Sequence, residues 1–216
     1  MKKLIIFDFD GTLVDSVGGL AAAVNYALKE MGFPTHSKNT IQGFIGNGIL
    51  SLAQKALPKD KRKPEILNET KNIFLKYYDA HNTDESYPYP GITQMLEALI
   101  EKGYMIAVAS NKYHAATVSM VAHFFPDIKF TCILGQREGV AVKPDPTIVF
   151  DVMSACKISD KDQVLYVGDS DVDMKTAHNA GVDACAVSWG FTSREILESL
   201  SPKYIVDSAE QFQTII

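Results

Sequence analysis

Two aspartates, Asp8 and Asp10, stand one residue apart directly after the apolar run LIIF at residues 4–7. If this run is a strand, the two side chains start on the same side of it. Two carboxylates about 4 Å apart repel each other by roughly 4 kcal/mol at an effective dielectric constant near 20. The pair therefore needs a compensating positive charge, and a divalent cation can supply it.

Other polar residues follow three further apolar runs of the chain. Because ligands of open parallel sheets bind beyond the carboxyl ends of the strands, we expect these residues to gather at one edge of a sheet. They are Ser110 and Asn111 after residues 104–109, Lys143 after residues 130–134, and Asp169 and Asp173 after residues 164–167.

The gathered side chains suit a hard metal ion and a phosphate group. Mg²⁺ prefers oxygen ligands, and the set holds no His or Cys that would favour zinc. Lys143 can neutralise a carboxylate or contact a phosphate oxygen. Ser110 and Asn111 can donate hydrogen bonds to phosphate oxygens. The cofactor predicted from these residues is therefore Mg²⁺.

The two N-terminal acids can divide a phosphoryl transfer between them. Gly11 breaks the strand direction and lets the Asp10 side chain turn away from that of Asp8. One acid can attack phosphorus and form an aspartyl phosphate. The other can protonate the leaving oxygen and later deprotonate water.

The elements that must position these residues alternate between strand and helix. Strands that alternate with helices form right-handed crossovers and a parallel sheet covered on both faces. The predicted fold class is therefore α/β, with a Rossmann-like parallel-sheet core. The patterns predict strands at residues 3–9, 104–109, 130–134, 164–167, 184–187 and 204–206, and helices at residues 92–102, 114–124, 146–156, 173–180, 193–200 and 208–214.

Residues 16–86 show only helical patterns and interrupt the alternation after its first strand. We expect an all-helical domain at residues 16–86, inserted into a core formed by residues 1–15 and 87–216. The two joints lie close together, so the insert can close over a ligand as a lid. Its glycine-rich loop GFIGNG, residues 43–48, can bring backbone N–H groups to an anionic substrate, and Asn47 is its best candidate for a substrate contact.

Three other polar or aromatic residues near these motifs have plainer interpretations. We expect Lys112 to open a helix and to face solvent or the inserted domain. We expect Asp171 to be a solvated surface residue. Trp189 is expected to pack in the core or to face the insert.

Composition limits the partners and the location. The chain has 216 residues, a formal net charge of −5 and 46% hydrophobic residues, which predicts a globular protein without a nucleic-acid-binding surface. Its three cysteines, Cys132, Cys156 and Cys185, are far apart and indicate reduced residues of a cytoplasmic protein. The first apolar run is too short for a signal peptide, and no run is long enough to span a membrane. A monomer and a homodimer are both compatible with the sequence.

At the residues named above, the sequence resembles the haloacid dehalogenase (HAD) superfamily of phosphohydrolases. The four motifs of that superfamily occur in order: DFDGT at residues 8–12, Ser110, Lys143, and GDSDVD at residues 168–173. The resemblance covers essentially the whole chain. It implies the HAD fold for the core and a C1 cap domain for the helical insert.

The resemblance implies roles for the four acids. Asp8 would be the nucleophile, and Asp10 would be the general acid and base. Mg²⁺ would be held by the Asp8 carboxylate, the Asp10 backbone carbonyl and Asp169. Asp173 would support the metal through water or hydrogen bonds.

The resemblance also implies which residues meet the phosphate. Ser110 and Lys143 would bind the phosphoryl group, with Lys143 also paired to the nucleophile. Gly11, Thr12 and Asn111 would be secondary phosphate contacts.

Within the superfamily the chain is similar to phosphoglycolate phosphatases, through FIGNG, PYPG, SNK, KPDP and WGF at residues 44–48, 88–91, 110–112, 143–146 and 189–191. The resemblance implies hydrolysis of a phosphoric monoester of a small metabolite, with 2-phosphoglycolate as the best guess. Phosphatases of pyrophosphate, nucleotides or sugar phosphates share much of this pattern. A β-phosphoglucomutase-like phosphomutase would share the chemistry up to the aspartyl phosphate. A non-catalytic binding protein is disfavoured, because every expected catalytic group is present.

Overall fold

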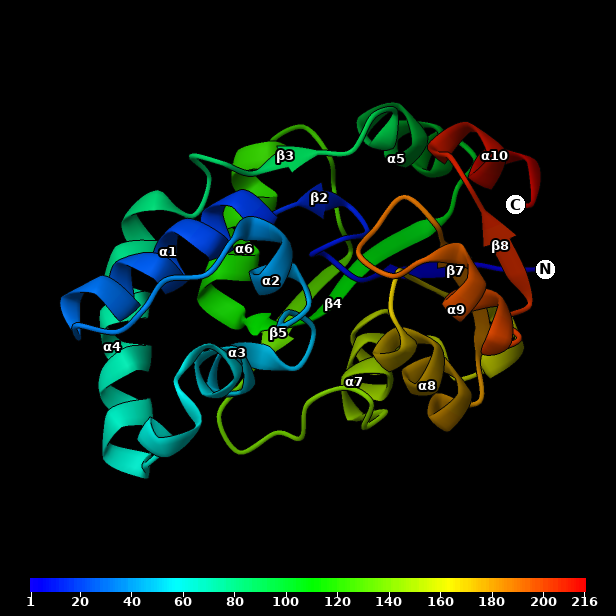
Figure 1. Cartoon of the computed structure of the whole chain (residues 1–216). Helices are drawn as coiled ribbons and strands as arrows, with labels where there is room; N and C mark the ends of the chain where they lie inside the picture. Colours follow the sequence, from blue (N-terminus) through cyan, green and yellow to red (C-terminus); the bar gives the residue numbers. More distant parts are fainter. The chain divides into compact units, whose positions relative to one another are not determined.

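The computed structural model describes all residues from 1 to 216 (Figure 1). The chain forms two compact units, one made of Met1–Asp15 with Pro88–Ile216 and the other of Ser16–Tyr87. No helix is both long enough and apolar enough to cross a membrane.

The first unit is built on a six-stranded sheet with the order β5-β4-β1-β6-β7-β8, and every pair of neighbouring strands is parallel. This confirms the predicted α/β class. The chain moves from β1 to β4 and β5 on one side and then crosses to β6, β7 and β8 on the other, so the strand order reverses beside β1. Ligands of such sheets bind at this reversal. The strands are β1 (Leu4–Phe7), β4 (Met105–Tyr113), β5 (Cys132–Gln136), β6 (Val164–Gly168), β7 (Asp183–Val187) and β8 (Tyr204–Val206).

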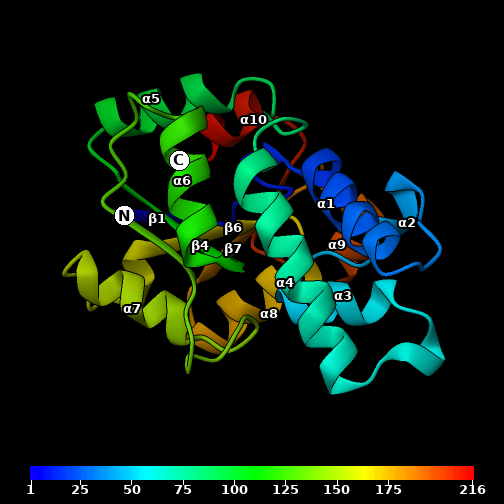
Figure 2. The ribbon, with the colours of Figure 1, turned by 90° about the vertical axis from the view of Figure 1, so that its left-hand side faces the viewer.

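Helices cover both faces of the sheet. Figure 2 shows α5 and α10 on one face and α7 and α8 on the other. The helices of this unit are α5 (Ile92–Glu101), α6 (His114–Phe124), α7 (Thr147–Ala155), α8 (Asp171–Ala180), α9 (Arg194–Ser199) and α10 (Ala209–Thr214), with a 3₁₀ turn at Lys161–Gln163. The apolar runs of β1 and β6 follow from this arrangement, because a strand covered on both faces is apolar at every position.

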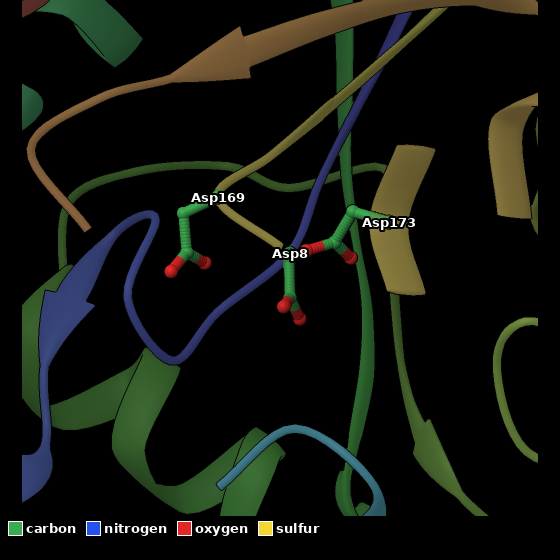
Figure 3. A group of neighbouring side chains, drawn as sticks. All are labelled: Asp8, Asp169 and Asp173. Carbon is green, nitrogen blue, oxygen red and sulfur yellow. The ribbon is translucent and has the colours of Figure 1, made fainter. Parts of the chain in front are cut away.

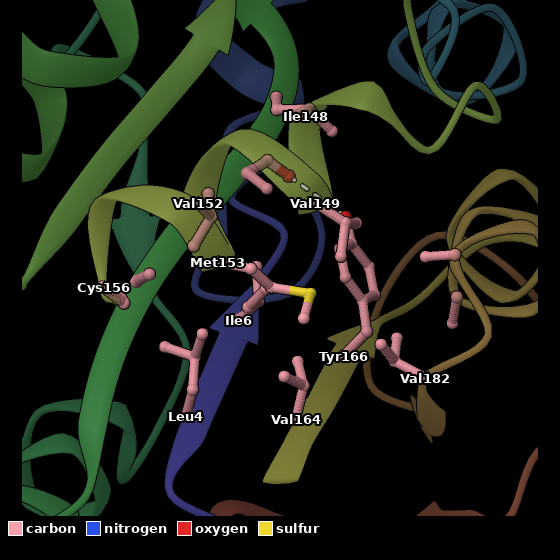
Figure 4. Close-up of a cluster of buried hydrophobic side chains, with 14 residues drawn as sticks. Leu4, Ile6, Ile148, Val149, Val152, Met153, Cys156, Val164, Tyr166 and Val182 are labelled. Atoms are coloured by element: carbon pink, nitrogen blue, oxygen red, sulfur yellow. Dashed lines mark hydrogen bonds between the residues drawn. The ribbon is translucent and has the colours of Figure 1, made fainter. Parts of the chain in front are cut away.

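The core on the α7 side shows how β1 is anchored (Figure 4). Leu4 and Ile6, which project from the same face of β1, belong to one buried cluster with Val149 and Val152 of α7. Tyr166 of β6 joins this cluster, although it carries a hydroxyl group. Phe7 points to the opposite face, where its ring lies 5.9 Å from that of Phe212 in α10.

The second unit contains α1 (Val17–Glu30), α2 (Lys38–Gln42), α3 (Gly48–Ala56), a 3₁₀ turn at Lys59–Lys61 and α4 (Pro64–His81). Helices α1 and α4 pack together, and the rings of Tyr26 and Tyr77 stack with centroids 4.4 Å apart. The two connections to the first unit, β2 (Val14–Asp15) and β3 (Tyr87–Pro88), form a two-stranded sheet.

Several predicted element boundaries are wrong; β5, for example, lies at Cys132–Gln136 rather than at residues 130–134. The first strand ends at Phe7 rather than residue 9, because the chain turns at once and the Val14 N–H donates to the Phe9 carbonyl, 3.1 Å away. The second core strand continues to Tyr113 rather than ending at residue 109. Helix α8 begins at Asp171 rather than residue 173, because Ser170 caps it through a reciprocal capping box.

Leu4 provides a test of the core packing. Its side chain is fully buried at the end of β1 remote from the polar loops. We expect Leu4→Ala to lower the free energy of unfolding by about 2–5 kcal/mol, because it removes buried apolar atoms and leaves a cavity. The volume-conserving control Leu4→Met should lower it by less than about 1.5 kcal/mol. Urea denaturation followed by circular dichroism measures both, and equal losses would contradict this packing.

Candidate active site

The polar loops meet at the carboxyl ends of β1, β4 and β6. The strand pairing places Phe7 level with Val108 and with Val167, so Asp8 after β1, Ser110 within β4 and Asp169 after β6 lie near the same height of the sheet. The chain then turns sharply after Asp10, where Gly11 has a backbone φ of +84°. An L side chain rarely adopts this angle, so glycine is suited to this position.

Asp8 is buried and held through one of its two carboxylate oxygens. Its Oδ1 accepts hydrogen bonds from the Phe9 N–H at 2.7 Å and from the Lys143 ammonium at 2.9 Å. No donor of the chain contacts Oδ2, so this oxygen can attack a substrate or bind a cation. Burial raises the pKa of Asp8 to about 7; Asp173 adds to the rise and Lys143 opposes it.

Lys143 occupies the centre of the site with only 2% of its side chain exposed. Its ammonium lies 2.9 Å from Asp8 Oδ1, 2.8 Å from Asp173 Oδ1, 2.9 Å from the Tyr166 hydroxyl and 3.1 Å from the Ala109 carbonyl. Burial by itself lowers the pKa of a lysine. The negative charges of Asp173 and Asp8 outweigh it, and the pKa of Lys143 lies well above its usual value. The lysine is therefore a permanent positive charge between two acids.

Asn111 fixes the backbone of Lys143. Its side-chain amide donates to the Lys143 carbonyl at 3.0 Å, and its side-chain oxygen accepts from the Lys143 N–H at 2.8 Å. These two bonds join the last residues of β4 to the loop after β5. The Asn111 side chain is thus bound to the backbone of Lys143. The predicted contact of Asn111 with a phosphate stays a prediction.

Asp169 is buried and oriented by hydrogen bonds on both oxygens. The Thr12 hydroxyl donates to Oδ1 at 3.1 Å, and the Phe191 N–H donates to Oδ2 at 2.7 Å. Burial raises the pKa of Asp169 well above its usual value; the negative charges of Asp173 and Asp8 add to the rise, and these hydrogen bonds oppose it. Thr12 was predicted to contact a phosphate. In the structure its hydroxyl instead donates a hydrogen bond to Asp169, a predicted metal ligand.

Asp173 supports Lys143 and caps a helix at the same time. Its Oδ1 accepts from Lys143 and from the Tyr166 hydroxyl, while its Oδ2 accepts from the backbone and hydroxyl of Ser170. Both oxygens are therefore engaged within the chain. Gly168 is required beside it, because a Cβ there would lie 2.4 Å from the Cβ and Cγ atoms of Asp173.

Asp8, Asp169 and Asp173 form the candidate metal centre (Figure 3). Each offers one carboxylate oxygen, and these oxygens all lie within 4.8 Å of one another. Burial raises the pKa of Asp8 and of Asp169, and the charges of the neighbouring carboxylates add to the rise. A divalent cation bound through oxygen would supply the missing charge, and the all-oxygen set fits a hard cation.

Ser110 and Lys112 lie in an irregular stretch of β4. Ser110 is buried, and its hydroxyl oxygen accepts from the Lys112 N–H at 3.2 Å, which leaves the hydroxyl proton for another acceptor. The expectation for Lys112 is wrong: it lies within the strand rather than in a helix, and its side chain is only 3% exposed. Its ammonium is 3.0 Å from Asp10 Oδ1.

Sequence reasoning missed Lys112 and Tyr166 as parts of this site. A tyrosine inside an otherwise apolar strand is a usable signal, because a buried phenol needs a hydrogen-bond partner. For Lys112 the strand pattern ends three residues earlier, at residue 109, so nothing in the sequence marks it as buried.

The remaining candidates lie elsewhere or have simple roles. Asn47 is exposed at the N-terminus of α3, in the Ser16–Tyr87 unit, and its substrate contact stays a prediction. Asp171 is exposed and pairs with Lys175, in agreement with a surface role. Trp189 is half-buried, and its indole N–H donates to the Thr12 carbonyl at 3.0 Å.

Comparisons with known proteins find similarity along the whole chain. A family model described as "Haloacid dehalogenase-like hydrolase" matches residues 5–187. A phosphoglycolate phosphatase from Haemophilus influenzae is 34% identical, over 99% of this chain and 98% of the relative. One from Pasteurella multocida is 33% identical over the same shares. A crystal structure of a predicted phosphoglycolate phosphatase from Haemophilus somnus has a TM-score of 0.91 at 31% identity, covering 99% of this chain and 97% of that one.

Gly11 offers a test of the metal centre. A Cβ at Gly11 would lie 2.4 Å from the Asp169 carboxylate, whereas a Cβ at Gly103, which has the same φ of +84°, would meet nothing within 4 Å. Both Gly11→Ala and Gly103→Ala should therefore lose about 1–2 kcal/mol of stability from backbone strain. Only Gly11→Ala should also weaken Mg²⁺ binding, because it displaces Asp169. Isothermal titration calorimetry tests this, and equal Mg²⁺ affinities in the two variants would argue against Asp169 as a ligand.

Proposed function

We propose that this chain, which belongs to the haloacid dehalogenase-like hydrolase family, is a Mg²⁺-dependent phosphatase that hydrolyses a small phosphate monoester through an aspartyl phosphate. One observation carries the proposal. Asp8 is held through Oδ1 by Lys143, while no donor of the chain contacts its Oδ2. A carboxylate fixed on one oxygen and open on the other is arranged as a nucleophile.

Asp8 carries the phosphoryl group during the reaction. Its Oδ2 forms a bond to phosphorus as the ester oxygen leaves. Lys143 offsets the charge of the nucleophile, so the phosphate anion meets less repulsion as it approaches. The Ser110 hydroxyl, whose proton has no acceptor in the chain, donates to a phosphate oxygen.

Asp10 handles the protons. In the first half of the reaction it gives a proton to the leaving oxygen, and the substrate departs as an alcohol. In the second half it takes a proton from water, which attacks phosphorus and releases phosphate from Asp8. Asp10 thus ends each cycle in the state in which it began.

Three groups would hold the metal: the Asp8 carboxylate, the Asp10 backbone carbonyl and Asp169. When bound, Mg²⁺ supplies positive charge that offsets the repulsion between buried acids and the phosphate. Asp173 would support the metal site indirectly and not as a direct ligand, because one of its oxygens binds Lys143 and the other binds Ser170. Thr12 and the Phe191 N–H keep Asp169 in place.

The substrate that we propose is 2-phosphoglycolate. Its support is the assignment of the relatives from H. influenzae and P. multocida, whose similarity extends over both units. In this proposal the Ser16–Tyr87 unit is a lid that excludes water. Its loop at residues 43–48, with the exposed Asn47, would contact the part of the substrate that differs between phosphate esters.

Asp8→Asn tests the proposed nucleophile. We expect phosphate release to fall by at least about 10³-fold, because the amide cannot form the acyl phosphate. The matched control is Asp171→Asn, which changes an acid of the same unit whose side chain is 48% exposed and pairs with Lys175; it should keep full activity. Chelation by EDTA should abolish release from the wild type, and Mg²⁺ should restore it. Full activity of Asp8→Asn, or activity unaffected by EDTA, would refute the proposed mechanism.

A panel of esters tests the substrate. With Mg²⁺ present, we expect kcat/KM to be highest for 2-phosphoglycolate, compared with pyrophosphate, nucleoside monophosphates and hexose phosphates. A higher value for another compound would replace the substrate and leave the phosphatase activity standing. Isomerisation of a sugar phosphate without phosphate release would indicate a phosphomutase instead.

A further inference from the structure

Lys112 is a second buried cation in the active site. Its side chain is 3% exposed, and its ammonium lies 3.0 Å from Asp10 Oδ1. A buried lysine without a partner is strongly unfavourable, so this contact accounts for its burial. The Asp10 side chain is itself only 12% exposed, so little solvent surrounds the pair.

An irregularity in the sheet directs Lys112 into the site. Strand β4 pairs with β5 at Ala109↔Leu134 and next at Tyr113↔Gln136, so β4 advances four residues (113 − 109) while β5 advances two (136 − 134). The extra residues leave the regular ladder, and bulges of this kind re-aim side chains. Ser110, Asn111 and Lys112 are the residues between the two paired positions.

The backbone of Lys112 is fixed on both sides of its side chain. Its N–H donates to the Ser110 hydroxyl oxygen, and its carbonyl accepts from the Thr117 hydroxyl, both at 3.2 Å. Gly135 of β5 lies so close that a Cβ there would be 2.5 Å from the Lys112 carbonyl oxygen. The Lys112 side chain therefore extends from a backbone position that is held in place.

The two lysines serve different acids. Lys143 is already surrounded by the oxygens of Asp8, Asp173, Tyr166 and Ala109. A lysine ammonium has only three protons to donate. A separate cation is thus needed for Asp10.

We propose, on the premise of the phosphatase reaction above, that Lys112 is a positioning residue that holds Asp10 through Oδ1 and aims its other oxygen at the ester oxygen that leaves. Because the ammonium donates to Oδ1, the proton exchanged with the substrate is carried by Oδ2. As the bond from Asp8 to phosphorus forms, the bond from phosphorus to the ester oxygen breaks, and this proton moves to the departing oxygen. Asp10 regains it from the water that cleaves the aspartyl phosphate.

The leaving group provides a test that separates positioning from other roles. A nitrophenolate leaves without a proton, whereas an alkoxide needs one. The ratio kcat/KM reports the first phosphoryl transfer for both esters. We expect Lys112→Met to lower kcat/KM at least about tenfold for 2-phosphoglycolate and for glycerol phosphate, and less than about threefold for p-nitrophenyl phosphate.

Four reference variants complete the experiment. Asp10→Asn should show the same preference for the aryl ester, and adding Lys112→Met to it should cause no further loss, because the two residues act as a unit. Lys112→Arg, which keeps the charge but alters the geometry, should lose less than Lys112→Met on the alkyl esters. Lys129→Met, at an exposed lysine of the same unit, should leave all three rates unchanged.

Distinct outcomes would overturn the proposal. Equal losses of Lys112→Met on aryl and alkyl esters would mean that Lys112 binds the phosphoryl group or supports the fold. A loss confined to 2-phosphoglycolate would mean that Lys112 binds the substrate carboxylate. If Lys112→Met does not fold, Lys112→Arg decides by the same ratio of aryl to alkyl rates. Absence of phosphate release by the wild type from any of these esters would instead contradict the proposed function.

Discussion

The ion pairs of Lys143 with Asp8 and Asp173 are the interaction on which the candidate site depends. Three acids are buried together at one sheet edge, and without a cation among them their charges could not be accommodated in the interior. Lys143 supplies that cation and touches two of the three. Several contacts keep Lys143 in place. Asn111 binds its backbone through two hydrogen bonds, and the Tyr166 hydroxyl accepts from its ammonium. The capping box of α8 with Ser170 fixes Asp173, one of its two acidic partners.

A parallel sheet makes this concentration of charge possible. The side chains come from the last residues of β4 and from the loops after β1, β5 and β6, strands that are far apart in sequence but neighbours in the sheet. Strands β1 and β6 each contribute an apolar stem that is fully buried, with a polar residue, Asp8 or Asp169, directly beyond it. The hydrophobic stems hold the loops firmly, as Leu4 and Ile6 do for Asp8. The stability of the core and the placement of the charges are therefore properties of the same strands.

The sequence allowed the parallel sheet, the order of its elements and the meeting of Asp8 with Asp169 and Asp173 to be predicted, because apolar runs and the polar residues after them are local patterns. It did not allow the position of Lys112 to be predicted. That position depends on a mismatch between β4 and β5, and the register of two strands separated by a helix is not a local property. The role of Tyr166 was missed for a related reason, since its hydroxyl meets partners from other segments. The early end of β1 results from a turn closed by backbone bonds around Gly11.

The pairing of β2 with β3 has a consequence for how such chains can diversify. The strand that leaves the core at Val14–Asp15 lies beside the strand that returns at Tyr87–Pro88, so the entry and exit of the helical segment are neighbours. A segment whose ends are adjacent can be lengthened, shortened or exchanged without moving the strands that flank it. In the proposed division of roles, the sheet edge performs the reaction and the inserted helices choose the substrate, so either could change while the other is kept.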